Sequence, residues 1–348
     1  LNIAIIGAGI AGITAARTLA KAGHHVHVFE KSRGAGGRMS TRESNFGTFD
    51  HGAQYFTVRD PRFSLAIQAV PGTTDICRPW SANAVRVLDP LGHVFEAARA
   101  TKDAHFVAKP GMNALVRHWA QPLGKALQLH TEVHRLERMP NGQWVVHASN
   151  SQASQDMPEV HSGFDRVLLA MPSVQAEQLL RNSGAHVAGA HLLDALGKVE
   201  VAPCWTLMLA FPNASQPGLA HLGPQWNAAR STHHRVTWLA RESSKPARGQ
   251  IERWTVQASA AWSQEHLEDA PDRVQAKLIK AFSEITGIRA TPAHAEVHRW
   301  RFAKTLQPLG KSHLHSQKQG IGVCGDWCLG HRVEDAFISG LELALAVI

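Results

Sequence analysis

The sequence predicts an α/β protein in which a Rossmann-like domain is combined with a second, mixed α+β domain. Residues 2–29 contain an isoleucine-rich run, a glycine-containing turn, a small-residue stretch and another apolar run, as in a parallel strand–helix–strand unit. From about Gly197 onward, tryptophan-rich apolar runs between polar turns predict the strands of another sheet. A chain of 348 residues is long enough for two domains, since single cores stop growing at roughly 250–300 residues.

The opening residues carry a dinucleotide-binding motif in its full structural context. "NIAIIG" predicts a strand, and "GAGIAGITAARTLAKAG" places Gly7, Gly9 and Gly12 at the start of a helix. The first glycine makes the tight turn, the second lets the backbone approach a pyrophosphate, and the third lets the helix pack on the strand. "HVHVFEK" predicts the next strand, which ends at Glu30, a carboxylate placed to accept hydrogen bonds from ribose hydroxyls. The dinucleotide phosphates are expected at the helix N-terminus.

A second match to the glycine spacing occurs in "GIGVCGDW". Asp326 and Trp327 follow it where a helix should begin, so this segment predicts a strand that ends at a Gly-Asp turn. A second nucleotide-binding fold is therefore not expected.

The middle of the chain predicts further helices and strands. "GMNALVRHWAQPL" is helical, "ALQLHTEVHRLERM" forms consecutive strands, and "PNG" turns the chain into the strand "QWVVHAS". "SNSQASQDMPEVHSG" is expected as a polar loop before the strand "FDRVLLAMP", and Ser173 is expected to cap the helix "SVQAEQLLRN". "APDRVQAKLIKAFSEITG" is an amphipathic helix, and "VEDAFISGLELALAVI" a closing helix that docks on the first domain.

These elements suggest a discontinuous arrangement of two domains. The dinucleotide-binding domain is expected to comprise residues 1–58, 105–172 and 320–348. Residues 59–104 and 173–319 are expected to form the substrate domain.

The composition is that of a globular protein with an excess of positive charge. Hydrophobic residues make up 44% of the chain, charged residues make up 18%, and the formal net charge is +8. Lysine and arginine are scattered, with no basic run or nucleic-acid-binding motif, so an anionic small molecule is a better partner than nucleic acid.

The cysteines and the N-terminal segment indicate the cellular compartment in which the protein is expected. The four cysteines lack the spacing of a metal or redox pair, so reduced thiols in a cytoplasmic protein are expected. The N-terminal apolar run is too short for a membrane span and lacks signal-peptide flanks. Paired histidines occur without a supporting cluster, so no metal is expected. Nothing in the sequence requires a membrane or an obligatory protein partner.

Several motifs, in order along nearly the whole chain, resemble one family. "IAIIGAGIAG", "FEKSRGAGGRMST" and "DHGAQYF" resemble the FAD-dependent amine-oxidase superfamily, in which a Gly-Gly-Arg loop and an Asp-x-Gly-Ala turn follow the nucleotide motif. "GMNALVRHWA", "WLARESSKPAR", "HRWRFA" and "GDWCLGHRVEDAFISG" are similar to its bacterial renalase-like branch. The resemblance implies an FAD-binding domain of the amine-oxidase/p-hydroxybenzoate-hydroxylase type.

The resemblance also implies how noncovalent FAD is bound. Arg38 is expected on the pyrophosphate, because its planar fork suits phosphate oxygens. Asp326 is expected to accept from the ribityl or nearby hydroxyls, and the amides that open the last helix to face the flavin N1–C2 edge. The residues expected to bind FAD are Gly7, Gly9, Ala11, Gly12, Glu30, Lys31, Gly37, Arg38, Gln54, Tyr55, Gly325, Asp326, Val333 and Ala336.

Substrate residues follow from the same resemblance, with two departures. The candidates are Tyr55, Gln257, Trp262 and Trp300. The strand "PCWTLMLAF" lacks the lysine that many amine oxidases place there, and relatives tend to carry a histidine at the position of Gln257. No catalytic side chain is identified, since the hydride acceptor is flavin N5.

Three functions stay open at this point. The first is an oxidase that converts 2- or 6-dihydro isomers of NAD(P)H to NAD(P)+ and reduces O2 to hydrogen peroxide. This oxidation needs no base, because hydride loss restores an aromatic pyridinium. The second is a flavin amine oxidase or related desaturase acting on a small amine, and the third is a flavin-binding protein without catalysis.

Overall fold

A mostly parallel sheet lies at the centre of the first domain. The computed structural model describes residues 1–80, 85–96, 103–152, 157–184, 187, 190–215, 224 and 226–348. The sheet order is β19-β20-β13-β1-β2-β9, with only β19 and β20 antiparallel. Its strands are β1 (Asn2–Ile6), β2 (His25–Phe29), β9 (Leu127–Gln128), β13 (Arg166–Leu169), β19 (Leu314–Ser316) and β20 (Ile321–Val323). The predicted Rossmann-like fold is confirmed.

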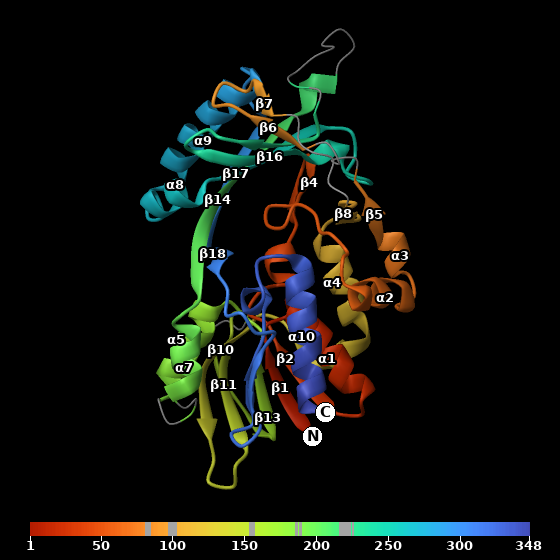
Figure 1. The fold of residues 1–348 in the computed structure, drawn as a ribbon, viewed down its shortest axis with the longest axis vertical. Helices are drawn as coiled ribbons and strands as arrows, with labels where there is room; N and C mark the ends of the chain where they lie inside the picture. The colour runs from red at the N-terminus through yellow and green to blue at the C-terminus, as the bar shows by residue number, and fades with distance from the viewer. Residues whose placement is uncertain are drawn as a thin grey trace.

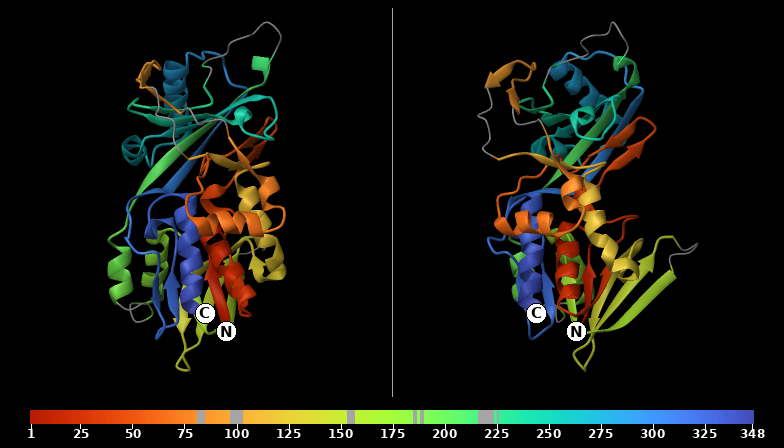
Figure 2. Two further views of the ribbon diagram at one scale, coloured as in Figure 1. Left: turned by 45° about the vertical axis from the view of Figure 1, so that its right-hand side comes forward. Right: turned by 90° about the vertical axis from the view of Figure 1, so that its right-hand side faces the viewer.

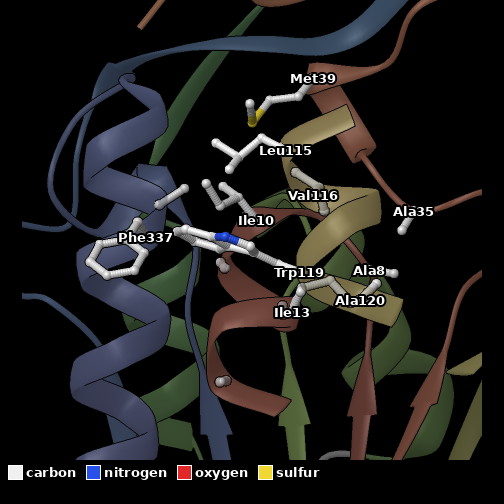
Figure 3. Packing of buried hydrophobic residues seen from close by; sticks show 14 of the residues in the cluster. Ala8, Ile10, Ile13, Ala35, Met39, Leu115, Val116, Trp119, Ala120 and Phe337 are labelled. Carbon is white, nitrogen blue, oxygen red and sulfur yellow. The ribbon is translucent and has the colours of Figure 1, made fainter. Parts of the chain in front are cut away.

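Three helices cover one face of this sheet. They are α1 (Ile10–Lys21), α4 (Asn113–Ala120) and α10 (Val333–Val347). Trp119 extends from α4 toward Phe337 of α10, with ring centroids 5.8 Å apart (Figure 3). A Cβ on Gly340 would lie 2.2 Å from the carbonyl oxygen of Ala11, so α10 approaches α1 as closely as backbone allows. The closing helix docks on the first domain as predicted.

A second, three-stranded sheet projects from the side of this domain (Figure 2). It contains β10 (Thr131–Arg138), β11 (Trp144–Asn150) and β12 (Met157–Phe164), and is followed by α5 (Ser173–Ser183) and α7 (Ala190–Leu196). The prediction of a loop over residues 149–163 is wrong for its second half, which pairs with β11 as an edge strand. Pro158, Val160 and Ser162 of this strand are exposed, so it lacks the apolar-in, polar-out alternation that would distinguish it from a loop. Residues 153–156 lie outside the described residues.

The predicted helix cap at Ser173 is also wrong. Pro172 occupies the cap position, and Ser173 is the first helical residue, with a fully buried side chain. Because proline fixes its own φ near the helical value, it starts the helix without a capping hydroxyl.

The second domain is built on a seven-stranded sheet of order β18-β14-β17-β16-β15-β6-β7. The strands are β6 (Arg86–Leu88), β7 (Val94–Glu96), β14 (Glu200–Phe211), β15 (Ala228–Ser231), β16 (Val236–Arg241), β17 (Glu252–Ala258) and β18 (His294–Gln307). Helices α8 (Ala260–Glu265) and α9 (Pro271–Thr286) cover one face. The long strands β14 and β18 run down toward the first domain (Figure 1). The predicted mixed α+β domain is confirmed.

Successive side chains of β14 point to opposite faces of this sheet, so their contacts show what each face packs against. Trp205, Leu207 and Leu209 belong to the core formed with α9. Met208 belongs instead to a small cluster with Phe49, at the end of β4. The uncovered face of the sheet therefore meets segments of the first domain.

The remaining described elements are short. They are β3 (Arg42–Ser44), β4 (Gly47–Phe49), β5 (Cys77–Pro79), β8 (Phe106–Ala108), α2 (Pro61–Ala69), α3 (Thr73–Ile76), and the short 3₁₀ turns η1 (Gly37–Met39), η2 (Gln121–Ala126), η3 (Pro212–Ser215), η4 (Glu242–Ser244) and η5 (Asp326–Cys328). Among the described residues, no helix combines the length and the apolar character needed to cross a membrane.

Packing suggests different domain boundaries from those predicted. Phe63 of α2 stacks near Phe337 of α10, and Trp119 donates to Thr73 of α3, so both helices lie against the first domain. Leu179 of α5 shares a core with β1 and β13. We propose that α2, α3 and α5 belong to the first domain.

Candidate functional site

The glycine-rich turn leaves an open space at one position only. A Cβ on Gly7 would lie 2.4 Å from the carbonyl oxygen of Ala170, and one on Gly12 would lie 2.0 Å from the carbonyl oxygen of Gly7. Both glycines are therefore required by the packing of the protein itself. A Cβ on Gly9 would meet no atom within 4 Å. Gly9 thus borders free space at the N-terminus of α1, where an anion is stabilised.

Glu30 fixes this turn from the end of β2. Its carboxylate accepts from the backbone N–H of Ala8 at 2.7 Å and from that of Ser32 at 2.8 Å. The side chain is buried, whereas Lys31 beside it is exposed. Glu30 therefore lies beside the glycine turn, as its predicted contact with a ribose requires.

The Gly-Gly-Arg loop crosses the same helix end. The N–H of Gly36 donates to the carbonyl of Ala8 at 3.0 Å, and Gly37 has a φ of +55°. A Cβ on Gly37 would lie 3.2 Å from the Cα of Gly9, so the two glycines approach through their backbones. Gly9 and Gly36, which belong to different segments of the sequence, also pair through an isolated backbone β-bridge.

Arg38 and Asp326, predicted on different parts of FAD, form one ion pair. The guanidinium donates to both carboxylate oxygens, at 2.5 and 3.2 Å, and to the carbonyl of Ala303 at 3.4 Å. The arginine side chain is 27% exposed and that of Asp326 is 8% exposed. The arginine is therefore held over η5 rather than solvated as a surface side chain.

The turn from Asp50 to Tyr55 packs on this loop. The N–H of Ala53 donates to the carbonyl of Arg38 at 2.9 Å. A Cβ on Gly52 would lie 2.0 Å from the same carbonyl oxygen, so any other residue here would push the turn off the loop. The side-chain amide of Gln54 donates to the carbonyls of Asp50 and Gly52, which closes the turn on itself.

Carboxylates fix the start of α10. Glu334 accepts from the backbone N–H groups of Arg59 and Asp60, both at 2.6 Å. Asp335 accepts from the N–H groups ahead of the helix, at His331 and Arg332. Val333 is half-buried, Ala336 is buried, and the N–H of Gly325 donates to a hydroxyl of the same helix. The first turn of α10 is thus tied to the segment that opens α2, and its second turn to η5.

Three of the four substrate candidates meet at the Asp50–Tyr55 turn. Gln257 donates to the carbonyl of Gly52 at 2.8 Å, and the Trp300 indole N–H donates to the carbonyl of His51 at 2.8 Å. The ring of Tyr55 lies 5.7 Å from that of Trp238. All three candidates are half-buried, so they border accessible space.

Trp262 does not join them. Ser259 caps α8 by accepting from the N–H of Trp262, which places the indole in the core on the α9 side of the sheet. Lys277 of α9 lies over this ring at 5.9 Å. Trp262 therefore lies on the face of the sheet opposite to Gln257.

Sequence reasoning missed a pair of histidines beside Trp300. His51 stacks on Trp300 with centroids 5.2 Å apart, and His298 meets His51 edge-on at 4.8 Å. Burial, the neighbouring His298 and Arg42 lower the pKa of His51 to about 3. Burial and Arg42 lower the pKa of His298 to about 4. Both imidazoles are neutral at physiological pH.

A fully buried cluster of charges was also missed. Asp50 accepts from Arg248 at 2.6 Å and from Lys245 at 3.2 Å, and Lys245 also donates to Glu242 at 2.9 Å. The side chains of these four residues have no exposed surface. Asp50 belongs to the first domain and the others to the η4 region, so the cluster joins the domains. The segment "WLARESSKPAR" contains the three partners, but a sequence does not tell buried charges from solvated ones.

Burial raises the pKa of both carboxylates of this cluster, but neighbouring groups offset this effect to different extents. Burial alone raises the pKa of Asp50, but Lys245, Arg248 and the N–H of Met112 outweigh it and hold the pKa at about 2. Burial raises the pKa of Glu242, which Lys245 offsets only in part. Asp50 is therefore the ionised partner of the two cations. The residues described here contain no His/Cys/Asp/Glu group that could hold a metal ion.

Comparisons with known proteins agree with this geometry. Residues 5–66 match the family described as NAD(P)-binding Rossmann-like domain, and residues 92–348 match the family described as Flavin containing amine oxidoreductase. A 4,4'-diapophytoene desaturase of Staphylococcus haemolyticus (strain JCSC1435) is 45% identical over 103 residues, which are 30% of this chain and 19% of that protein. The corresponding desaturase of Staphylococcus aureus (strain Newman) is 46% identical over 52 residues, 15% of this chain and 10% of that protein. The matched part is thus a small fraction of each relative.

Two solved structures share the fold over almost the full length. One, from Exiguobacterium sp. 255-15, is provisionally described as a protoporphyrinogen oxidase; it has a TM-score of 0.77 and 14% identity, and the match covers 99% of this chain and 98% of that one. The other is an engineered putrescine oxidase with a TM-score of 0.71 and 12% identity, with the same coverage of 99% and 98%. At these identities the likeness concerns the fold.

Proposed function

Because the chain belongs to the flavin containing amine oxidoreductases, we propose that it is an FAD-dependent oxidase of dihydronicotinamide isomers. The substrate class is the 2- or 6-dihydro isomers of NAD(P)H, which are oxidised to NAD(P)+ while O2 is reduced to hydrogen peroxide. The observation that carries this proposal is the surface beside the Asp50–Tyr55 turn, which presents no strong base and where Arg42, in contact with His298, is paired with Glu296. Gln257, Trp238 and Trp300 carry no charge, and His298 is neutral because its pKa is about 4.

A surface without a strong base suits oxidation of a dihydropyridine. Loss of a hydride restores an aromatic pyridinium, so the step needs no base. An amine must lose a proton first, and here Lys245 is fully buried between Asp50 and Glu242, which keeps it from accepting a proton from a substrate. This chain's residues would instead bind and orient the reacting ring.

The residues present fit FAD. Gly9 borders open space at the N-terminus of α1, which suits the pyrophosphate, and Glu30 lies beside it. Arg38 follows Gly37, whose backbone approaches Gly9, and its guanidinium would contact phosphate oxygens while Asp326 orients it. When bound, FAD supplies the acceptor for the substrate hydride and passes the electrons to O2. We propose that the cofactor is held noncovalently, since the cysteines among the described residues are buried or half-buried.

The positive charge of the chain favours an anionic dinucleotide over a cationic amine. A net charge of +8 attracts phosphates and repels ammonium groups at long range. The second candidate, an amine oxidase or desaturase, draws on the names of the structural neighbour and the desaturase relatives. A flavin-binding protein without catalysis is the third.

Anaerobic titration of the flavin-loaded protein separates these functions. We expect the yellow colour to bleach with a 2- or 6-dihydro isomer and not with putrescine or other small amines. The rate constant for reduction at low substrate should fall as salt rises, and the limiting rate should be nearly flat over roughly pH 6–9. Bleaching by an amine, with a rate that climbs with pH, would assign the amine-oxidase function. If no compound bleaches the flavin, the third candidate, a flavin-binding protein without catalysis, is supported.

Replacement of Arg38 tests the cofactor site. We expect Arg38→Ala to weaken FAD binding by about 1.5–3 kcal/mol, the typical contribution of a hydrogen bond to a charged group. Lysine should restore only part of this loss, because it lacks the planar fork. FAD retention after serial dilution measures the effect, with Arg301→Ala, which removes an exposed ion pair with Glu268, as the matched control. Equal retention in both variants would remove Arg38 from the cofactor site.

A further inference from the structure

Side chains of the second domain hold the Asp50–Tyr55 turn in place. The Trp300 indole and the Gln257 amide each donate to one backbone carbonyl of the turn, at 2.8 Å. Lys245, which directly follows η4, contacts the same turn with a side chain that has no exposed surface. The turn that packs on the Gly-Gly-Arg loop therefore depends on the second domain for its position.

Lys245 uses its whole donor capacity on buried acceptors. Its ammonium lies 3.2 Å from Asp50 Oδ2, 3.4 Å from Gln54 Oε1 and 2.9 Å from Glu242 Oε1. An ammonium has three donors and no acceptor, so these contacts exhaust it. Asp50 begins the turn and Gln54 closes it. Lys245 therefore holds both ends of the turn through one charged group.

The orientation of the Gln54 amide follows from these contacts. Its nitrogen donates to the backbone carbonyls of Asp50 and Gly52, which can only accept. The amide oxygen is thereby directed to Lys245, and in the part of the chain that the structure describes no other group donates to it. Gln54 is buried. Removal of Lys245 would leave this oxygen as a buried acceptor without a donor, which favours a rearrangement of the turn.

The turn in its present position fixes the backbone of Arg38. The N–H of Ala53 donates to the Arg38 carbonyl at 2.9 Å, and a Cβ on Gly52 would lie 2.0 Å from that oxygen. Asp326 orients the guanidinium at the other end of the same residue. A displaced turn would therefore shift the Arg38 backbone and strain the alignment of its guanidinium with phosphate oxygens, on which a charge-assisted hydrogen bond depends.

We propose that Lys245 is a positioning residue of the cofactor site, which acts through Gln54 and the Asp50–Tyr55 turn on Arg38. Its ammonium is enclosed by Asp50, Gln54 and Glu242, so it affects the cofactor only through other residues. The inference rests on the proposed binding of FAD by Arg38. It places one determinant of cofactor affinity in the second domain, so that FAD binding and the contact between the domains stabilise each other.

FAD retention by the loaded protein over serial dilution tests this in a double-mutant cycle. Lys245→Met should weaken FAD binding about fivefold when Arg38 is present, the typical effect of one hydrogen bond. In the Arg38→Ala background it should change the affinity little, because the residue through which it acts is gone. Thr255→Val is the matched control: Thr255 donates to Glu242 in the same cluster, at 2.7 Å, and the variant should keep wild-type affinity.

Phosphorus NMR of the bound FAD gives a second readout. The pyrophosphate resonances should move in Lys245→Met toward their positions in Arg38→Ala, and should keep their wild-type positions in Thr255→Val. A general loosening of the fold would instead weaken binding by the same factor whether or not Arg38 is present.

Gln54→Met tests the same route and keeps every charge of the cluster, so it replaces Lys245→Met if that variant does not fold. It should weaken binding with Arg38 present and change little in the Arg38→Ala background. Wild-type affinity in the folded variant, or an equal loss in both backgrounds, would overturn the positioning role. If Arg38→Ala alone retains FAD as wild type does, the proposed phosphate contact fails and the inference fails with it. Bleaching of the flavin by dihydronicotinamide isomers is measured separately and still decides the proposed reaction.

Discussion

Asp50→Ala is expected to lower the free energy of unfolding by about 3–5 kcal/mol, the usual result of removing one partner from a buried ion pair. The Asp50 carboxylate accepts from Lys245 and Arg248, and also from the Thr41 hydroxyl at 2.8 Å and the Met112 N–H at 2.9 Å. Without it, two buried cations are left with one carboxylate whose own pKa is raised by burial. The loss is therefore that of an uncompensated buried charge, in addition to the lost hydrogen bonds.

Urea unfolding of wild type and variant measures this loss. Glu268→Ala is the matched control, because it also removes a carboxylate shared by two arginines, Arg299 and Arg301, but at the exposed surface; it should change stability little. In the double variant Asp50→Ala/Lys245→Met, part of the stability should return, since one unpaired cation is gone. A loss in Asp50→Ala no larger than that of the control would show that the cluster does not stabilise the fold.

Local sequence patterns predicted the first domain well because its determinants are local. Gly12 is excluded from carrying a side chain by Gly7 of the same strand–helix–strand unit, and the apolar runs of β1 and β13 are buried. Gly7 is constrained instead by Ala170, which follows β13. The error over β12 has the opposite cause. A solvent-facing edge strand is recognised by its pairing with β11, and its own composition carries little of that information.

The sequence predicted only those residues of the candidate site that lie in recognisable motifs. The sequence indicated Gln257 and Trp300 individually, but the placement of Gln257 and His298 on either side of β14 depends on the register of three strands. The pairing of Asp50 with Lys245 and Arg248 likewise spans a sequence separation of almost 200 residues. Trp262 was selected by its motif, and the cap at Ser259 turns it to the other face of the sheet. Long-range register and strand facing are the information that a single sequence does not supply.

Mild acid is expected to destabilise the protein by about 4 kcal/mol between pH 7 and pH 5, through the two buried histidines. The folded-state pKa values of His51 and His298, about 3 and about 4, lie below the value of 6.5 that the unfolded chain has. The unfolded state therefore takes up protons in this range and the folded state does not. The stabilisation is fully present above pH 6.5 and is lost as the pH falls toward the folded-state values. The two histidines contribute nearly equally, about 2 kcal/mol each, because both folded-state pKa values lie below pH 5.

His51→Phe isolates this contribution. Phenylalanine keeps an aromatic ring to stack on Trp300, and the carbonyl that accepts from the Trp300 indole is backbone, so both contacts survive. Asp50 does not titrate in this range, since its pKa is about 2. Urea unfolding at pH 7, 6 and 5 should therefore give a shallower pH dependence for the variant, by about 2 kcal/mol over the two units. Parallel curves for wild type and variant would mean that His51 takes up a proton in the folded protein over the same pH range as in the unfolded chain.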